Sequence, residues 1–199
     1  LLEKAGAALV SPDLKRGISK VGYIPGAGDD VAESLQAAGY EVTLLDPGQI
    51  DRNTLGGYEA IVTGIRAFNV HTGLHKKMDV LLDYVKEGGN LIVQYNTNSW
   101  VGPLNFSPGP YPFTISRLRT TDEEAKVEII DPKHPAFNHP NIISQKDFDG
   151  WVQERGIYFA ADVDERYSKL LRMHDTGEEP LDGSLITTKY GKGNFVYTG

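Results

Sequence analysis

Short apolar runs alternate with helix-like patterns over residues 19–98, and this alternation restricts the folds open to the chain more than any other feature. Two amphipathic runs predict helices, "DDVAESLQAAG" and "HKKMDVLLDYVKEGG". Four apolar runs around them predict strands: "SKVGYI", "YEVTLLD", "YEAIVTGI" and "NLIVQYN". Strands and helices that alternate with short turns form βαβ units, so we predict an α/β fold with a parallel sheet and helices on both faces.

The helix predictions rest on spacing and on glycine stops. In the first helix Val31, Leu35 and Ala38 recur at helical spacing, and Gly39 follows as a C-terminal stop. In the second, the apolar residues share one face and Gly88-Gly89 end the helix; these residues are Met78, Leu81, Leu82 and Val85.

The rest of the chain is read as part of one domain covering residues 1–199. Residues 1–18 predict an N-terminal helix and linker, and residues 99–121, rich in Pro, Gly and aromatic residues, predict a long loop excursion. The second half predicts a β-rich excursion, with "YGKGN" as a hairpin turn: its strand-like runs are "AKVEIID", "WVQERGIYFA", "YSKLLRMHD", "GSLITTKYG" and "GNFVYTG". The chain starts without Met and stops just after a strand, so we expect an excised domain.

Composition excludes several classes of function. The net charge of −7 argues against a general nucleic-acid or anionic-membrane binder, and the apolar runs are too short to span a bilayer. There is no cysteine, which excludes disulfides, thiolate metal sites and a Cys nucleophile.

A Gly-Ala-Gly turn follows the first predicted strand, in "VGYIPGAGDD". A dinucleotide fingerprint would need a third glycine where Val31 stands, and no P-loop Gly-Lys-Ser/Thr is present. Asp29 and Asp30 stand where the helix should begin, so their carboxylates can cap its N–H groups and would repel a phosphate. We predict a self-capped structural turn rather than a phosphate cradle.

Polar residues follow the third and fourth predicted strands, whose ends should be neighbours in the sheet. Amides, hydroxyls and a guanidinium beside aromatic rings suit a sugar or other polyol, although Asn and Thr after a strand often only build the turn. The candidate ligand-binding residues are Arg66, Asn69, Gln94, Asn96, Thr97, Asn98 and Trp151. Trp100, Tyr158 and Phe68 are further candidates for stacking.

Several long stretches carry a family resemblance: "GYEAIVTGIRAFN", "LLDYVKEGGNLIVQYNT", "DFDGWVQERGIYFA" and "YGKGNFVYTG". From about Ser19 onward the chain resembles the C-terminal class I glutamine amidotransferase-like region of bacterial PIG-L/LmbE-type deacetylases. The resemblance implies a flavodoxin-like fold, a catalytic deacetylase domain as partner in the same parent chain, and an extracytoplasmic location, periplasmic or secreted.

Neither chemistry associated with that family matches these residues. The deacetylase zinc motif of the His-Pro-Asp-Asp type is absent, since His134-Pro135 and His139-Pro140 precede Ala and Asn. Amidotransferase chemistry needs a Cys after the fourth strand. Ser99 or Thr97 could replace it only on a strained elbow, but "NTNSW" lacks the small flanking residues. His71 and His75 could share a helix face as metal ligands, but no third ligand is near, and helix-start packing is the better interpretation.

The stretch "DFDGWVQERGIYF" offers Asp149, Glu154 and Arg155 for acid–base chemistry or, more simply, for structural ion pairs. The sequence therefore predicts no catalytic residue, metal or cofactor. The leading hypothesis is a catalytically silent accessory domain that binds a glycan or packs on the catalytic domain. The alternatives are a hydrolase using Ser, Thr or carboxylates at the strand ends, and a purely structural interaction module.

Overall fold

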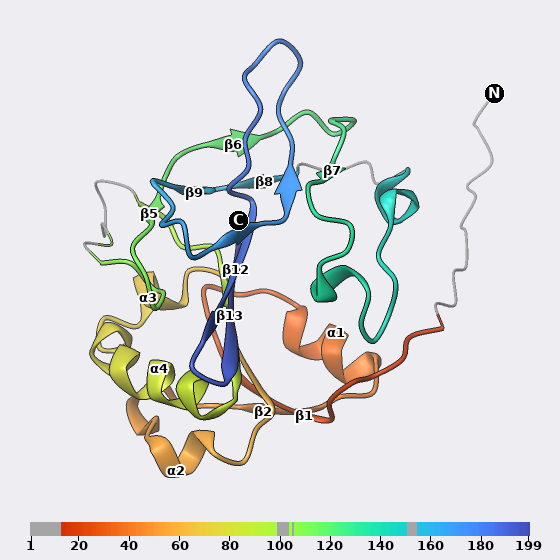
Figure 1. Cartoon of the computed structure of the whole chain (residues 1–199). Coiled ribbons are helices and arrows are strands. Elements are labelled where there is room, and N and C mark those ends of the chain that lie inside the picture. Colours follow the sequence, from red (N-terminus) through yellow and green to blue (C-terminus); the bar gives the residue numbers. More distant parts are fainter. Residues whose placement is uncertain (1–12, 99–103, 105, 151–154) are drawn as a thin grey trace, which may run out of the picture.

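The computed structural model describes residues 13–98, 104, 106–150 and 155–199, and a seven-stranded sheet runs through its centre (Figure 1). The strand order is β10-β12-β13-β4-β3-β1-β2. The five strands from β13 to β2 are parallel, and β12 is antiparallel to both of its neighbours. The bounds are β1 Lys20–Ile24, β2 Glu41–Leu44, β3 Ala60–Thr63, β4 Asn90–Gln94, β10 Ser168–Lys169, β12 Leu185–Tyr190 and β13 Gly193–Thr198. The predicted α/β fold around a mostly parallel sheet is confirmed.

The first half of the chain follows the predicted alternation. Helix α1 (Val31–Ala37) connects β1 to β2, and α4 (Met78–Glu87) precedes β4. Gly39 has φ 90°, a left-handed conformation that suits the predicted helix stop. Three short helices were not predicted: η1 (Pro47–Gln49), α2 (Arg52–Leu55) and α3 (Ala67–Val70). A fourth, η2 (Leu74–Lys77), forms the beginning of the helix predicted from His75 onward.

The larger apolar core lies between the sheet and α4. Leu91 and Val93 of β4 point to this side, as do Phe195 and Tyr197 of β13, because alternate residues of a strand share a face. Leu81 of α4 fills the space above them and is fully buried. Leu55 of α2 also belongs to this core.

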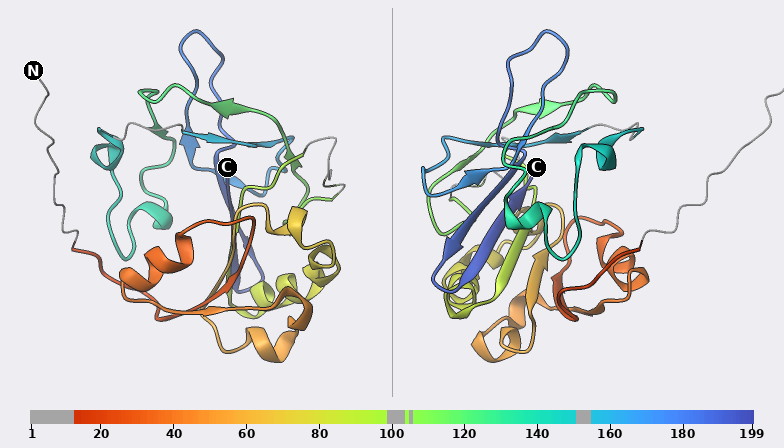
Figure 2. Two further views of the ribbon diagram at one scale, coloured as in Figure 1. Left: turned by 180° about the vertical axis from the view of Figure 1, so that it is seen from behind. Right: turned by 45° about the vertical axis from the view of Figure 1, so that its right-hand side comes forward.

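The opposite face of the sheet carries a smaller core. Val21 and Tyr23 of β1 and Val62 of β3 pack there against Ala32 of α1. Figures 1 and 2 show α1 and α4 on opposite sides of the sheet. In the described part of the chain, α1 is the one α-helix that adds residues to this second core.

The second half forms short antiparallel pairs beyond the carboxyl ends of the parallel strands (Figure 2). β5 (Thr114–Ile115) pairs with β9 (Ala160–Ala161), β6 (Arg119–Thr120) with β8 (Gly156–Ile157), and β7 (Glu128–Ile129) with β11 (Leu171–Arg172). Two short helices, η3 (Pro135–Phe137) and η4 (Gln145–Phe148), lie between β7 and β8 in the chain. The β-rich excursion is therefore confirmed.

One local prediction needs correction. Residues 99–121 are not loop throughout, because β5 and β6 pair with strands some forty residues further on, which local sequence does not reveal. The helix predicted near the N-terminus falls on residues 1–12, which lie outside the described residues, so it stays a prediction. Residues 13–18 contain no helix, as expected for the predicted linker, and Lys15 exchanges two hydrogen bonds of 2.9 Å with Asn141.

The predicted hairpin turn of "YGKGN" is confirmed between β12 and β13. Gly191 adopts φ 63°, and a Cβ there would lie 2.6 Å from the Lys86 carbonyl oxygen. Both constraints favour glycine at this position. Among the described residues, no helix has the length and apolar character needed to cross a bilayer.

Candidate functional site

The ends of β3 and β4 lie side by side, as the sequence predicts, and bring together the candidate ligand-binding residues that follow these two strands. Asn96, just beyond β4, is fully buried. Its Oδ1 accepts a hydrogen bond from the Phe68 backbone N–H at 3.0 Å, and its Nδ2 donates to the Gln94 carbonyl at 2.9 Å. Both ends of this amide are therefore engaged inside the protein.

Neighbouring amides at this edge are engaged in the same way. Asn69 donates to the Thr97 carbonyl at 3.0 Å and accepts from the Thr97 N–H at 2.9 Å. Asn98 donates to the Ile115 carbonyl of β5 at 2.9 Å, and the Gln94 amide donates to the Tyr23 hydroxyl at 3.3 Å. These side chains hold the loops after β3 and β4 to each other and to the β-rich half.

The two remaining candidate residues are Arg66 and Trp151. Arg66 is exposed and has φ 57°, and its backbone N–H donates to the Tyr95 carbonyl at 2.7 Å. Trp151 lies outside the described residues, as do Trp100 and Ser99. Tyr158, a further stacking candidate, stacks on Tyr95 with the ring centroids 5.9 Å apart.

The Gly-Ala-Gly turn closes the crevice where ligands usually bind in such sheets, between the loops that follow β1 and β3. Asp29 accepts hydrogen bonds from the Val31 N–H at 3.1 Å, the Ile65 N–H at 3.0 Å and the Tyr23 hydroxyl. Burial and this carboxylate raise the pKa of Tyr23 well above its ordinary value. The carboxylate already occupies the N–H groups that a phosphate would need.

The role predicted for the two aspartates is thus divided. Asp29 makes the expected bond to the start of α1, whereas Asp30 occupies the N-cap position without a side-chain capping bond. The backbone at Gly26 lies so close to the loop after β3 that a side chain would not fit. A Cβ at this position would lie 2.0 Å from the Ile65 carbonyl oxygen. The hydrogen bonds of Asp29 therefore support the interpretation of this turn as structural.

An open cavity lies next to the strand ends, and we call it the α3 hollow. It has a volume of about 580 Å³, within the range of small-molecule sites, and its walls are mostly apolar with a few polar groups. It is lined by Phe68, Asn69, Thr72, His75, Met78, Leu82, Leu104, Phe106, Ser107 and Gly109. Of the described members of the predicted ligand-binding set, Asn69 is the one that lines it.

Aromatic rings form part of the wall of the α3 hollow. The Phe68 and Phe106 rings meet edge to face with centroids 5.5 Å apart, and the His75 ring lies 6.0 Å from Phe106. Sequence reasoning pointed to Phe68 for stacking and weighed His75 as a metal ligand, but it missed Phe106. The aromatic composition of residues 99–121 was the available signal, yet it did not indicate which ring would return to α3.

The histidines do not form a metal site in the described residues. His71 makes a 2.8 Å hydrogen bond between its Nε2 and the Pro25 carbonyl, whereas His75 contacts Phe106. His134 accepts a hydrogen bond from the Ala136 N–H through its Nδ1, as part of a turn. Nowhere in the described ranges do three or more His, Asp or Glu side chains gather to hold a metal ion.

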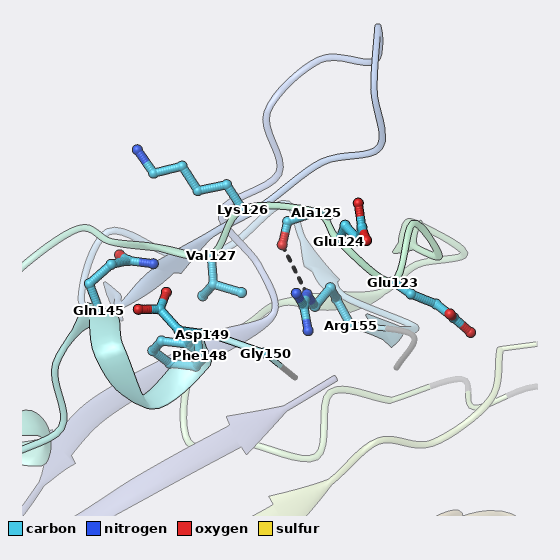
Figure 3. A pocket seen from close by; sticks show the side chains of 10 residues that line it. All are labelled: Glu123, Glu124, Ala125, Lys126, Val127, Gln145, Phe148, Asp149, Gly150 and Arg155. Carbon is cyan, nitrogen blue, oxygen red and sulfur yellow. Dashed lines mark hydrogen bonds between the residues drawn. The ribbon is translucent and has the colours of Figure 1, made fainter. Parts of the chain in front are cut away.

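The "DFDG" stretch borders a smaller cavity of about 340 Å³, shown in Figure 3. Arg155 lies between the Phe148–Gly150 turn and residues 123–127, and its Nε donates to the Ala125 carbonyl at 2.9 Å. Glu154 lies outside the described residues, so an acid–base pair with Asp149 stays a prediction. The bond from Arg155 to Ala125 holds two segments of the β-rich half together.

Comparison with known proteins shows similarity of fold. No family model and no curated protein matches the chain. The cytoplasmic protein STM3548 from Salmonella typhimurium has a TM-score of 0.60 at 15% identity, covering 90% of this chain and 86% of that one. A GMP synthase component from Thermoplasma acidophilum has a TM-score of 0.52 at 9% identity, covering 92% and 84%.

A carbohydrate-active enzyme also contains a similar fold. The cold-adapted β-galactosidase from Rahnella sp. R3 has a TM-score of 0.55 at 18% identity, covering 90% of this chain and 28% of the galactosidase. At these identities the similarities concern the fold alone.

Proposed function

We propose that this chain is a catalytically silent accessory domain with an amidotransferase-like fold, of the kind that accompanies PIG-L/LmbE-type N-deacetylases. Its role is to hold a glycan in the α3 hollow for a catalytic domain of the same parent protein. An extracytoplasmic location is part of the same proposal.

One observation carries the proposal: the polar side chains at the strand ends are engaged in holding the loops together. Asn96 and Asn69 each use both donor and acceptor of the amide on backbone groups. A catalytic group must be able to reach substrate and exchange protons with it. The amides cannot act in this way, and Asp29, the carboxylate beside these loops, is already bonded to the Val31 and Ile65 N–H groups. This favours a silent domain over a hydrolase that would use these residues.

The α3 hollow supplies what a glycan site needs. Thr72 and His75 offer polar groups beside the Phe106 ring, in a cavity of about 580 Å³. A sugar presents hydroxyls on its edge and an apolar face, which match such a mixture. The fold similarity to part of a β-galactosidase lends further support, since a fold of this kind occurs within a larger sugar-processing chain.

A thermal-shift screen against N-acetylated and simple sugars tests the proposal. Ligand at about 100 times its dissociation constant should stabilise the protein by about 2.7 kcal/mol, or about 5–10 °C for a chain of this size. Thr72→Ala and His75→Ala should abolish the shift, because both residues line the hollow. His174→Ala, at an exposed histidine outside the hollow, is the matched control and should keep the shift.

The outcomes separate the three functions. A shift lost in both hollow variants, with the sugar recovered unchanged, supports the silent binding domain. Release of acetate or cleaved sugar in the same samples would favour the hydrolase. The absence of any shift across the panel would favour a structural module that docks on its catalytic partner.

A further inference from the structure

A second cavity lies on the face of the sheet that carries α1, and we call it the sheet groove. Its volume is about 690 Å³, and strands β4, β13 and β12 form its floor. The floor residues include Ile92 and Val196, in the middle of β4 and β13, and both are only half-buried. Central strands of a parallel sheet are normally buried on both faces, so an apolar floor left open here is unusual.

The sheet groove has two walls from distant parts of the chain. Ile18 and Tyr40 form one wall, and residues 134–140 form the other. Lys15 precedes the first wall in the chain, and Asn141 follows the second. The two hydrogen bonds between Lys15 and Asn141 therefore connect the two walls at one end. Figure 1 shows the 130–145 segment on the same side of the sheet as α1.

The charge of the sheet groove differs from that of the whole molecule. The chain has 27 acidic and 20 basic residues, yet among the described residues no Asp or Glu lines this cavity. Lys189 lines it instead, and His134 and His139 add imidazole rings. Arg166 also lines it, but its guanidinium is paired with Asp164 at 2.7 Å and adds little net charge.

Hydrogen-bond donors accompany the positive charge of Lys189. The Nδ1 atom of His134 accepts from the Ala136 N–H at 3.2 Å, so a neutral His134 carries its proton on Nε2 as a donor. Ser168 and Tyr40 add hydroxyl groups to the lining. An apolar floor with cationic and donor groups at the rim complements a ligand that combines an anionic head with an apolar body.

We propose that the sheet groove binds a small organic anion with an apolar body, at a site separate from the α3 hollow. This inference does not depend on the proposed function, because the two cavities have no lining residue in common within the described part of the chain.

Fluorescence titration with a matched pair of dyes tests the inference. The probe is 1-anilinonaphthalene-8-sulfonate, and its neutral counterpart is N-phenyl-1-naphthylamine, which has the same apolar body without the sulfonate. The whole chain should bind one sulfonate dye per molecule, at least about fivefold more tightly than the neutral dye. Two opposite unit charges about 4 Å apart in water gain roughly this factor in affinity.

Two lysines of the same hairpin serve as variant and control. Lys189→Gln should remove most of the preference for the sulfonate dye while leaving binding of the neutral dye unchanged. Lys192→Gln, at the exposed hairpin turn outside the groove, should change neither affinity. Ala136→Glu, which places a carboxylate at the exposed rim, should abolish the preference as well.

Several results would overturn the proposal. One is equal affinity for the two dyes, a second is equal effects of the two lysine variants, and a third is no binding of either dye. Sedimentation of the chain as a dimer that Ala136→Glu dissociates would show instead that a second copy covers the groove.

Discussion

At the scale of single residues, the polar side chains at the strand ends act as structural links. Asn96 is the clearest case, because it is fully buried and both ends of its amide bond backbone groups. Asp29 does the same for the loops after β1 and β3. Arg66, although it belongs to the same predicted set, is exposed and contributes its backbone rather than a buried side chain.

Asn96→Ala should therefore destabilise the protein strongly, whereas Arg66→Ala should not. Losing the amide leaves the buried Phe68 N–H unsatisfied, which costs about 2–3 kcal/mol and lowers Tm by about 4–12 °C. Arg66→Ala should stay within about 0.5 kcal/mol of the parent, because an exposed side chain is removed. Urea unfolding of both variants measures this difference, and similar midpoints for the two would contradict the role assigned to Asn96.

At the scale of elements, α4 shows how one helix serves both the core and a cavity. Leu81 is fully buried against the sheet, while Leu82, the next residue, is half-buried and lines the α3 hollow. Successive residues of a helix point about 100° apart, which places the two side chains on different sides of one apolar stripe. The predicted apolar face is confirmed, but its edge is open to the hollow.

Leu81→Ala should cost about 2–5 kcal/mol, the range for a fully buried leucine that leaves a cavity. Leu82→Ala should cost clearly less, because its side chain keeps part of its exposure in the folded protein. Instead, it should enlarge the α3 hollow and weaken any ligand found there. Chemical denaturation gives both costs, and a Leu82→Ala cost equal to that of Leu81→Ala would show that the hollow is closed in solution.

At the scale of the whole molecule, buried tyrosines connect stability to high pH. Tyr23, Tyr84, Tyr167 and Tyr197 are all buried and come from separate elements or loops. Burial raises the pKa of each, to about 12 for Tyr84. Above pH 10 the unfolded chain therefore loses tyrosine protons that the folded chain keeps. Stability that is fully present below pH 10 is then lost as the pH rises through the folded values.

The free energy of unfolding should fall steeply above pH 10, and Tyr84→Phe isolates one contribution. The variant should lose about 1 kcal/mol at pH 8, because the 3.1 Å bond from the Tyr84 hydroxyl to the Tyr58 carbonyl disappears. Between pH 10 and 12 its stability should fall less steeply than that of the parent, by up to about 1.4 kcal/mol per pH unit. Urea midpoints from pH 8 to 12 measure both slopes, and parallel curves would exclude this contribution from Tyr84.

Local sequence determined the parallel half of the sheet and the two longer helices. Apolar runs such as that of β4 and the helical spacing of α4 depend on neighbours a few residues apart, so they can be read directly from the chain. It also placed the strand-end residues of β3 and β4 together, since carboxyl ends of neighbouring parallel strands meet at one edge.

Only the tertiary structure decided what those residues do. Whether Asn96 faces a ligand or the Phe68 N–H depends on a loop 28 residues away, and the pairing of β5 with β9 spans a still longer distance. The α3 hollow and the sheet groove likewise arise where distant segments meet, with Phe106 beside His75 and residues 134–140 beside Ile18. Such cavities depend on packing between segments, which leaves no periodic signal in the sequence.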